Sequence, residues 1–191
     1  MSDPISADNG VRSRTRRAIL DAASTVLTTN PAASLADIAA AAGVGRSTLH
    51  RYFPERTELL RSLAMHVHAL SNAAIDRAEP TRGAPLDALR RVVETQLDLG
   101  PIVPFIYNEP TIVADPELAA HLDTGDEVIV EVLNRVSSHP PSGPPEWPRL
   151  AFWALLDAGY TALRTNNASR VEIVDAIMTS LTTGIINPEQ A

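Results

Sequence analysis

The segment from Leu35 to Pro54, LADIAAAAGVGRSTLHRYFP, restricts the possible folds more than any other part of the chain. Its first half has apolar residues at helical spacing, with the small Ala39 where a second helix would cross closely. Gly43 ends this helix, because a sharp turn needs a residue that adopts a positive φ. Leu49 and Phe53, four residues apart, anchor a following helix on the same core. The segment therefore predicts a helix-turn-helix.

The second of these helices has hydrogen-bonding side chains over almost all of its free face. They are Arg46, Ser47, Thr48, His50, Arg51 and Tyr52. A helix buried in a protein core would not have so many polar groups, so this face favours DNA as its partner. An arginine can form a bidentate contact with guanine in the major groove. We expect Arg46, Ser47, Thr48 and His50 to contact base edges, with Thr48 and His50 entering the groove.

Residues 16–60 resemble the DNA-binding domain of the TetR-type transcriptional repressors. The matching segments are AILDAASTVL (18–27), SLADIAAAAGV (34–44), GRSTLHRYF (45–53) and PERTELL (54–60). They contain the signature TLxxYFxxRxxLL, which is more specific than a bare helix-turn-helix. The match covers about a quarter of the chain, and beyond Leu60 only the length and helical character agree.

Two positions depart from the family pattern. Gly45 stands where a serine often precedes the arginine of the recognition helix, so a side-chain cap or phosphate contact is lost. His50 stands where a tyrosine is more common, and an imidazole can still donate to a phosphate or a base edge. These departures affect which DNA sequence is bound and leave the fold unchanged.

The resemblance also implies contacts with the DNA backbone. Tyr52 ends the recognition helix, and Arg56 lies at the start of the next helix, where the helix dipole favours a phosphate. Arg14 and Arg16, at the start of the first helix, are expected beside the groove, and so is Ser34, which caps the helix before the turn. For each arginine, a solvated helix face is the alternative.

The charge distribution agrees with an N-terminal DNA-binding face. The net charge is −7, yet residues 1–61 contain eight arginines and six acidic residues, giving +2. Residues 62–191 contain the other eight arginines and seventeen acidic residues, giving −9. An acidic remainder would repel DNA and favour docking through the basic segment. Ordinary variation of surface charge is the alternative.

Composition excludes several classes of protein. There is no cysteine, so disulfides and thiolate metal sites are excluded. No apolar run approaches the ~20 residues of a membrane span, and the polar start MSDPISADNG is not a signal peptide. We expect a cytoplasmic protein that has no membrane partner and no cofactor.

Helical periodicity and proline positions predict an all-α fold of about nine helices. We expect a disordered tail over residues 1–11, a DNA-binding domain over 12–60, and a ligand-binding and dimerisation domain over 61–191. The helices are expected near residues 12–28, 35–42, 46–53, 54–78, 85–99, 116–138, 148–164 and 169–183. Residues 100–110 contain three prolines and predict a short helix or a turn, and HPPSGPPEWP (139–148) predicts a connector.

The resemblance implies a small-molecule site in the C-terminal domain. Phe105, Tyr107 and Trp153 are candidate lining residues, with His66 and His121 beside them, although each could belong to the core. We expect a hydrophobic effector, with cations favoured by the acidic balance. His66 and His68 lie two apart on a helix, on nearly opposite faces, so they cannot chelate one metal ion together. His121 could join one of them, but we expect no metal site.

The last two long helices are predicted to form a dimer interface. Ala154 and Ala158 form a stripe of small residues, and Val174, Ile177 and Leu181 repeat at helical spacing. The resemblance implies a four-helix bundle with the same helices of a second copy.

These features predict a homodimeric, ligand-responsive repressor that binds a palindromic operator in double-stranded DNA. An enzyme is disfavoured, because no catalytic triad, glycine-rich phosphate loop or paired metal-ligand motif stands at diagnostic spacing. The other alternative is a DNA-binding architectural or cell-division protein that uses the same fold.

Overall fold

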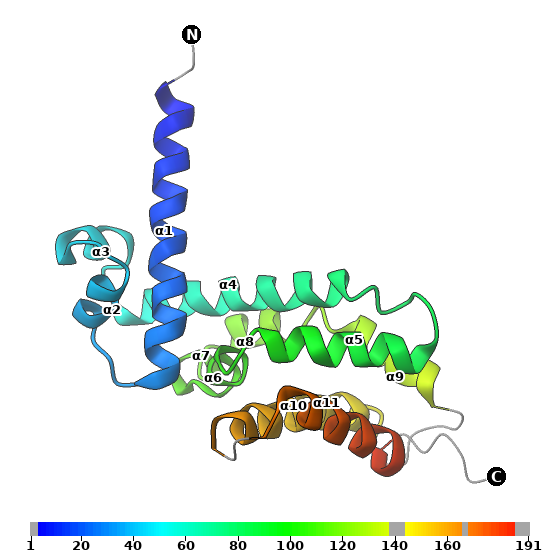
Figure 1. The fold of residues 1–191 in the computed structure, drawn as a ribbon. Coiled ribbons are helices and arrows are strands. Elements are labelled where there is room, and N and C mark those ends of the chain that lie inside the picture. Colours follow the sequence, from blue (N-terminus) through cyan, green and yellow to red (C-terminus); the bar gives the residue numbers. More distant parts are fainter. Residues whose placement is uncertain (1–3, 138–143, 166–167, 186–191) are drawn as a thin grey trace. The chain divides into compact units, whose positions relative to one another are not determined.

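A computed structural model describes residues 4–137, 144–165 and 168–185, and every regular element in these ranges is helical (Figure 1). The all-α prediction is confirmed, with eleven α-helices in the described ranges instead of about nine. They are α1 (Pro4–Thr29), α2 (Leu35–Ala41), α3 (Arg46–Tyr52), α4 (Arg56–Arg77), α5 (Pro85–Asp98), α6 (Ile102–Asn108), α7 (Pro110–Val113), α8 (Pro116–Leu122), α9 (Glu127–Val136), α10 (Trp147–Thr165) and α11 (Arg170–Thr179). A π-helical turn (Ser180–Ile185) follows α11. No helix in the described ranges is long and apolar enough to cross a membrane.

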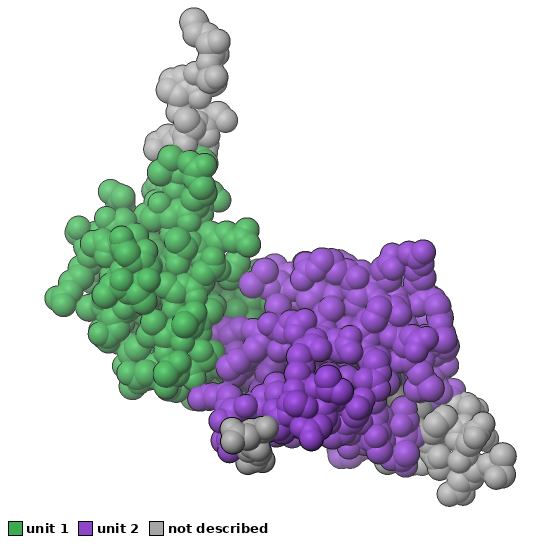
Figure 2. Space-filling model, viewed as in Figure 1, with its two compact units in different colours: residues 1–67, 105–119 green, residues 68–104, 120–191 purple. Residues whose placement is uncertain are grey.

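The chain divides into two compact units (Figure 2). The N-terminal unit comprises residues 1–67 and 105–119, and the C-terminal unit comprises residues 68–104 and 120–191. The predicted boundary between residues 60 and 61 falls inside α4, seven residues before the end of the first segment. In addition, residues 105–119 join the N-terminal unit, which the sequence analysis did not anticipate.

The first helix is longer than predicted. It begins at Pro4 instead of Arg12, so residues 4–11, which the sequence analysis assigned to a disordered tail, are helical. Proline suits the first position of a helix, because its missing N–H would have no partner there. Gly10 lowers helix propensity without ending the helix. Residues 1–3 lie outside the described residues.

The single helix predicted over residues 116–138 is wrong, because the chain breaks between α8 and α9. Gly125 adopts φ +87°, and a Cβ atom there would meet the side chain of Asn72. Leu122, before the break, and Ile129, after it, are both buried. The sequence therefore shows one apolar stripe that continues through the break. Residues 139–143, half of the proline-rich connector, lie outside the described residues, and α10 begins at Trp147.

The N-terminal unit has the core that the helix-turn-helix requires. Ala39, Leu49 and Phe53 are at most 1% exposed, as predicted. Ser34 caps α2 in a capping box with Asp37, in which each side chain accepts a hydrogen bond from the other residue's backbone N–H. The hydrogen bonds from Ser34 hold the pKa of the Asp37 carboxyl below its usual value.

The C-terminal unit is built on α5, α9, α10 and α11, whose apolar faces form one buried cluster. Gly159 allows close packing of α10 on α11, because a Cβ atom there would lie 3.0 Å from methyl groups of Ile173 and Ile177. Ser71 and Gln96 exchange two hydrogen bonds inside this unit, at 2.9 and 3.1 Å. Burial raises the pKa of the Tyr160 hydroxyl, which donates to the Gln96 carbonyl.

Two arginines hold the connection between α4 and α5. Arg91 donates to the carbonyl oxygens of Ala78, Glu79 and Arg82 at 2.8, 2.9 and 2.8 Å. Arg135 of α9 donates to two further carbonyls of the same connection, at 2.7 and 3.0 Å. Five carbonyls of the connection after α4 thereby gain charged donors.

We predict that Arg91→Met lowers the free energy of unfolding by about 2–4 kcal/mol, because three charge-assisted hydrogen bonds are lost. Arg90→Met is the matched control. Arg90 makes a surface ion pair with Asp175 at 2.8 Å, so its loss should cost roughly 0–1 kcal/mol. Urea-unfolding midpoints measure both variants. Equal losses would contradict a structural role for the Arg91 hydrogen bonds.

Candidate functional site

The exposed face of α3 is the candidate surface for base recognition. Arg46, Ser47 and His50 are exposed, and Thr48 is half-buried. In α3 only Leu49 is buried, so a single apolar anchor supports an otherwise polar helix. Gly45 forms the N-cap without a side-chain hydrogen bond, in agreement with the departure noted in the sequence. The polar face is thus available to a partner, while its DNA contacts stay a prediction.

Two arginines predicted to contact DNA phosphates have partners within the N-terminal unit. The Arg16 guanidinium donates to the Ser62 hydroxyl at 2.8 Å and lies 5.3 Å from the ring centroid of Phe53. Arg56 donates to the Ala33 carbonyl and, at 2.6 Å, to the Pro31 carbonyl. Arg56 therefore joins the start of α4 to the connection between α1 and α2. Their phosphate contacts stay predictions, but each arginine also has a structural role.

The other predicted backbone contacts lie at the surface of the same unit. Arg14 is exposed on α1, and the Ser34 hydroxyl is engaged in the α2 capping box. Tyr52 is half-buried at the end of α3, with the Arg51 guanidinium 5.8 Å from its ring centroid. The predicted DNA-contacting residues thus belong to one compact unit.

The five predicted ligand-site residues do not belong to one unit. His66, Phe105 and Tyr107 are part of the N-terminal unit, whereas His121 and Trp153 are part of the C-terminal unit. The assignment of these five residues to one ligand site in the C-terminal domain stays a prediction. The helical turn of α4 directs His66 towards α1, where its Nε2 atom lies 3.2 Å from Asp21 Oδ1.

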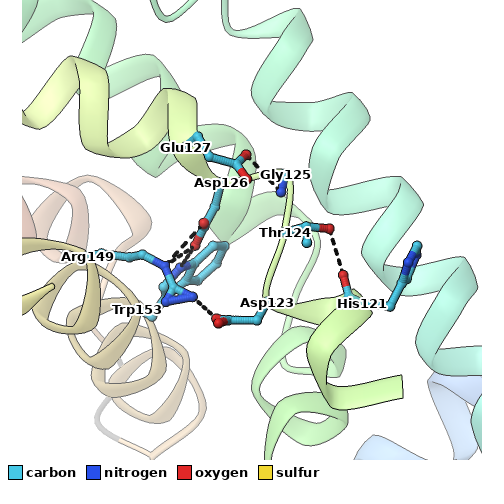
Figure 3. Close-up of polar contacts among 8 residues, drawn as sticks. All are labelled: His121, Asp123, Thr124, Gly125, Asp126, Glu127, Arg149 and Trp153. Atoms are coloured by element: carbon cyan, nitrogen blue, oxygen red, sulfur yellow. Dashed lines mark hydrogen bonds and ion pairs between the residues drawn. The ribbon is translucent and has the colours of Figure 1, made fainter. Parts of the chain in front are cut away.

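A buried polar cluster in the C-terminal unit joins the break before α9 to α10 (Figure 3). The Asp126 carboxylate is 9% exposed and accepts hydrogen bonds from Arg149 Nε at 2.9 Å and Trp153 Nε1 at 2.8 Å. Arg149 also pairs with Asp123. We call Asp123, Asp126, Arg149 and Trp153 the Asp126 cluster. The ion pair with Arg149 and the hydrogen bond from the indole compensate for the burial of the Asp126 carboxylate.

Of the Asp126 cluster, only Trp153 was predicted from the sequence as a site residue. The available signal was DTGDE (123–127), in which a glycine interrupts a helical pattern between acidic residues. Arg149 gave no comparable signal, because it lies 23 residues from Asp126 and only the folded chain brings the two together.

Two histidines of the C-terminal unit, His68 and His121, lie against each other. His68 is 5% exposed, and its ring meets that of His121 edge to face, with centroids 5.3 Å apart. Asn72 Nδ2 lies 3.2 Å from His68 Nε2. Burial lowers the pKa of His68, and a positive charge on His121 acts in the same direction. Among the described residues, no group of three or more ligating side chains is placed to hold a metal ion.

The predicted dimer residues fall into two groups. Val174, Ile177 and Leu181 are at most 3% exposed, because the apolar stripe of α11 faces the core of its own unit. These three side chains have little surface left for a partner, and their assignment to the interface stays a prediction. Ala154 and Ala158 are exposed on α10, as an interface requires.

Two large apolar residues of α10 extend the exposed alanine stripe. Trp147 is 48% exposed and Leu150 is 50% exposed. Together with Ala154 and Ala158 they recur at helical spacing on one side, and we call these four residues the α10 stripe. The sequence analysis missed Trp147 and Leu150, because periodicity alone does not tell which of two apolar stripes faces the core.

Comparison with known proteins identifies close relatives. The family described as "Bacterial regulatory proteins, tetR family" matches residues 19–63. The HTH-type transcriptional repressor LfrR of Mycolicibacterium smegmatis is 67% identical over 186 residues, 97% of each chain. The HTH-type transcriptional regulator NfxB of Pseudomonas aeruginosa is 32% identical over 79 residues, 41% of this chain and 42% of NfxB. A crystal structure of LfrR in complex with proflavine superposes with a TM-score of 0.83 at 68% identity, covering 91% of this chain and 98% of LfrR.

Proposed function

Because this chain belongs to the TetR family of bacterial regulatory proteins, we propose that it represses transcription as a homodimer released from a palindromic operator by a hydrophobic cation. Like its relatives, it is a helix-turn-helix transcriptional regulator and not an enzyme. The exposed polar face of α3 is the observation that carries the DNA-binding part of the proposal. Since operator DNA is its proposed partner, we place its action in the cytoplasm.

The proposed dimer uses the α10 stripe. Two helices that present alanines to each other can approach closely, while Trp147 and Leu150 supply the larger apolar area. A symmetric pair of α10 helices would bury both the alanines and the two larger side chains, because an isologous interface brings the same patch of each copy together. Paired recognition helices would then meet successive major grooves of a palindrome.

The proposed effector is a planar, hydrophobic cation. LfrR was crystallised with proflavine, an aromatic dye that carries a positive charge at neutral pH. In this chain the C-terminal unit has a buried carboxylate, Asp126, hydrogen-bonded to the indole of Trp153. The Trp153 ring can stack on such a ligand, and because Arg149 already pairs with Asp126, the preference for a cation rests on the acidic balance of residues 62–191, −9. An effector releases DNA only if it binds the two conformations of the dimer with different affinity.

We predict specific binding to a palindromic duplex with Kd of roughly 10⁻⁸–10⁻¹¹ M at physiological salt. Thr48→Ala or His50→Ala should change the preferred sequence, whereas Arg14→Ala should weaken binding to all sequences and reduce the salt slope by about one. Genome-wide mapping followed by titrations at several salt concentrations measures these effects. Many dispersed sites without a shared palindrome would instead indicate an architectural protein.

We predict that Leu150→Glu converts the dimer to a monomer. A glutamate on the α10 stripe would place an unpaired charge in each half of the interface and raise the dimer Kd roughly hundredfold or more. Leu86→Glu is the matched control, since Leu86 is 46% exposed on α5. Analytical ultracentrifugation should show a dimer for the wild type and the control. A Leu150→Glu protein that stays dimeric would exclude the α10 stripe as the interface.

We predict that proflavine stabilises the protein by about 2.7 kcal/mol at a hundredfold excess over its Kd. The neutral tricycle acridone should stabilise it less, because it lacks the positive charge that the acidic balance of residues 62–191 favours. Proflavine also binds DNA, so operator release is compared between the wild type and Trp153→Ala on the same duplex. Equal release by both proteins would remove Trp153 from the effector site, and preferential stabilisation by small anions would contradict a cationic effector.

A further inference from the structure

A cleft of about 470 Å³ lies within the N-terminal unit, beside the helix-turn-helix. It is bounded by α1, α4 and the first residues of α8. Its lining residues are Arg16, Arg61, Ser62, Met65, His66 and Leu118. All six belong to the same compact unit. This volume falls in the range of small-molecule sites, roughly 300–1,000 Å³.

The polar side of the cleft has two permanent positive charges. The Arg16 guanidinium is oriented by its hydrogen bond to the Ser62 hydroxyl and by the Phe53 ring. These two contacts leave further N–H donors on a side chain that stays exposed. Arg61 is half-exposed and pairs with Asp115. An arginine held by one partner while it presents other donors is suited to bind an anionic group.

The nearest carboxylates do not line the cleft. Asp115 is engaged by Arg61, and Asp21 lies 3.2 Å from the His66 ring. The lining itself contains no carboxylate, so the charges that a ligand would meet are positive.

Two apolar side chains also line the cleft. Met65 is 42% exposed on α4, and Leu118 is 4% exposed. A methionine side chain adapts to ligands of different shape because it is unbranched and flexible. An exposed methionine beside two arginines thus forms a surface with one apolar and one cationic part.

We propose that this cleft binds an amphipathic organic anion, an aryl- or alkyl-carboxylate. Its carboxylate would accept hydrogen bonds from Arg16 and Arg61, and its hydrocarbon part would contact Met65 and Leu118. This site differs in position and in charge preference from the cationic site proposed for the C-terminal unit. Arg16 would thus bind a small molecule in addition to its contact with Ser62.

The three methionines of the chain provide a site-specific test. Met65 lines the cleft, Met178 is buried in the C-terminal unit, and Met1 is terminal. The full-length protein is labelled with ¹³C-methyl methionine, and the Met65 signal is assigned from Met65→Leu. Titration with 4-phenylbutyrate should shift the Met65 signal saturably and leave the Met178 signal in place. The neutral amide and the amine of the same skeleton should leave the Met65 signal in place at equal concentration.

Variants then test the charges. Arg16→Gln should weaken 4-phenylbutyrate binding about tenfold, the effect of losing one charge-assisted hydrogen bond. Arg61→Gln should do the same and provides a second test if Arg16→Gln disturbs the contact with Phe53. Arg14→Gln is the matched control, because it removes the same charge from α1 outside the lining.

Three results would overturn the proposal. An unmoved Met65 signal at 10 mM 4-phenylbutyrate would show that the cleft does not bind organic anions. A stronger response to the amine would show that Asp21 and Asp115 determine the charge preference instead of the arginines. Equal weakening by Arg14→Gln and Arg16→Gln would show only a general effect of net charge.

Discussion

The anchoring of α3 by Leu49 and Phe53 is the contact on which the proposed DNA recognition depends. These two side chains are almost completely buried, and Ala39 is small enough to let the helices of the turn cross closely. With its apolar side fixed in this way, α3 has only polar residues left for its outer face. The same contact orients Arg16, whose guanidinium lies against the ring of Phe53. Phe53 thus supports both the recognition surface on α3 and the Arg16 side chain that lines the neighbouring cleft.

In the C-terminal unit, buried polar groups determine where helices begin and how they meet. The Asp126 cluster holds the break between α8 and α9 against α10, and Gly159 sets the distance between α10 and α11. A buried carboxylate is retained here at the cost of desolvation, offset by the arginine and indole donors. Because Trp153 is both a donor in this cluster and a proposed contact for an effector, ligand binding would alter the hydrogen bonding of Asp126 directly.

Sequence reasoning succeeded where the signals are local. The helix-turn-helix core and the cap of α2 by Ser34 involve residues within one or two turns, so spacing alone predicts them. It failed where partners are distant in the chain. Arg16 and Ser62 are 46 residues apart, and the apolar repeat of α11 gives no sign of whether Ile177 faces its own core or a second copy. The break at Gly125 was not predicted, because apolar residues recur at helical spacing both before and after it.

The arginine contacts between α4 and α5 affect how this connection responds to force. Loops between helices usually absorb movement, since their backbone groups are hydrated and free to rotate. Here Arg91 and Arg135 donate five hydrogen bonds to the carbonyls of a short connection. A planar guanidinium binds two or more acceptors at fixed angles, which a flexible ammonium group does not. We expect the corner between α4 and α5 to resist bending more than a hydrated loop would, so that the last turn of α4 and the start of α5 tilt together.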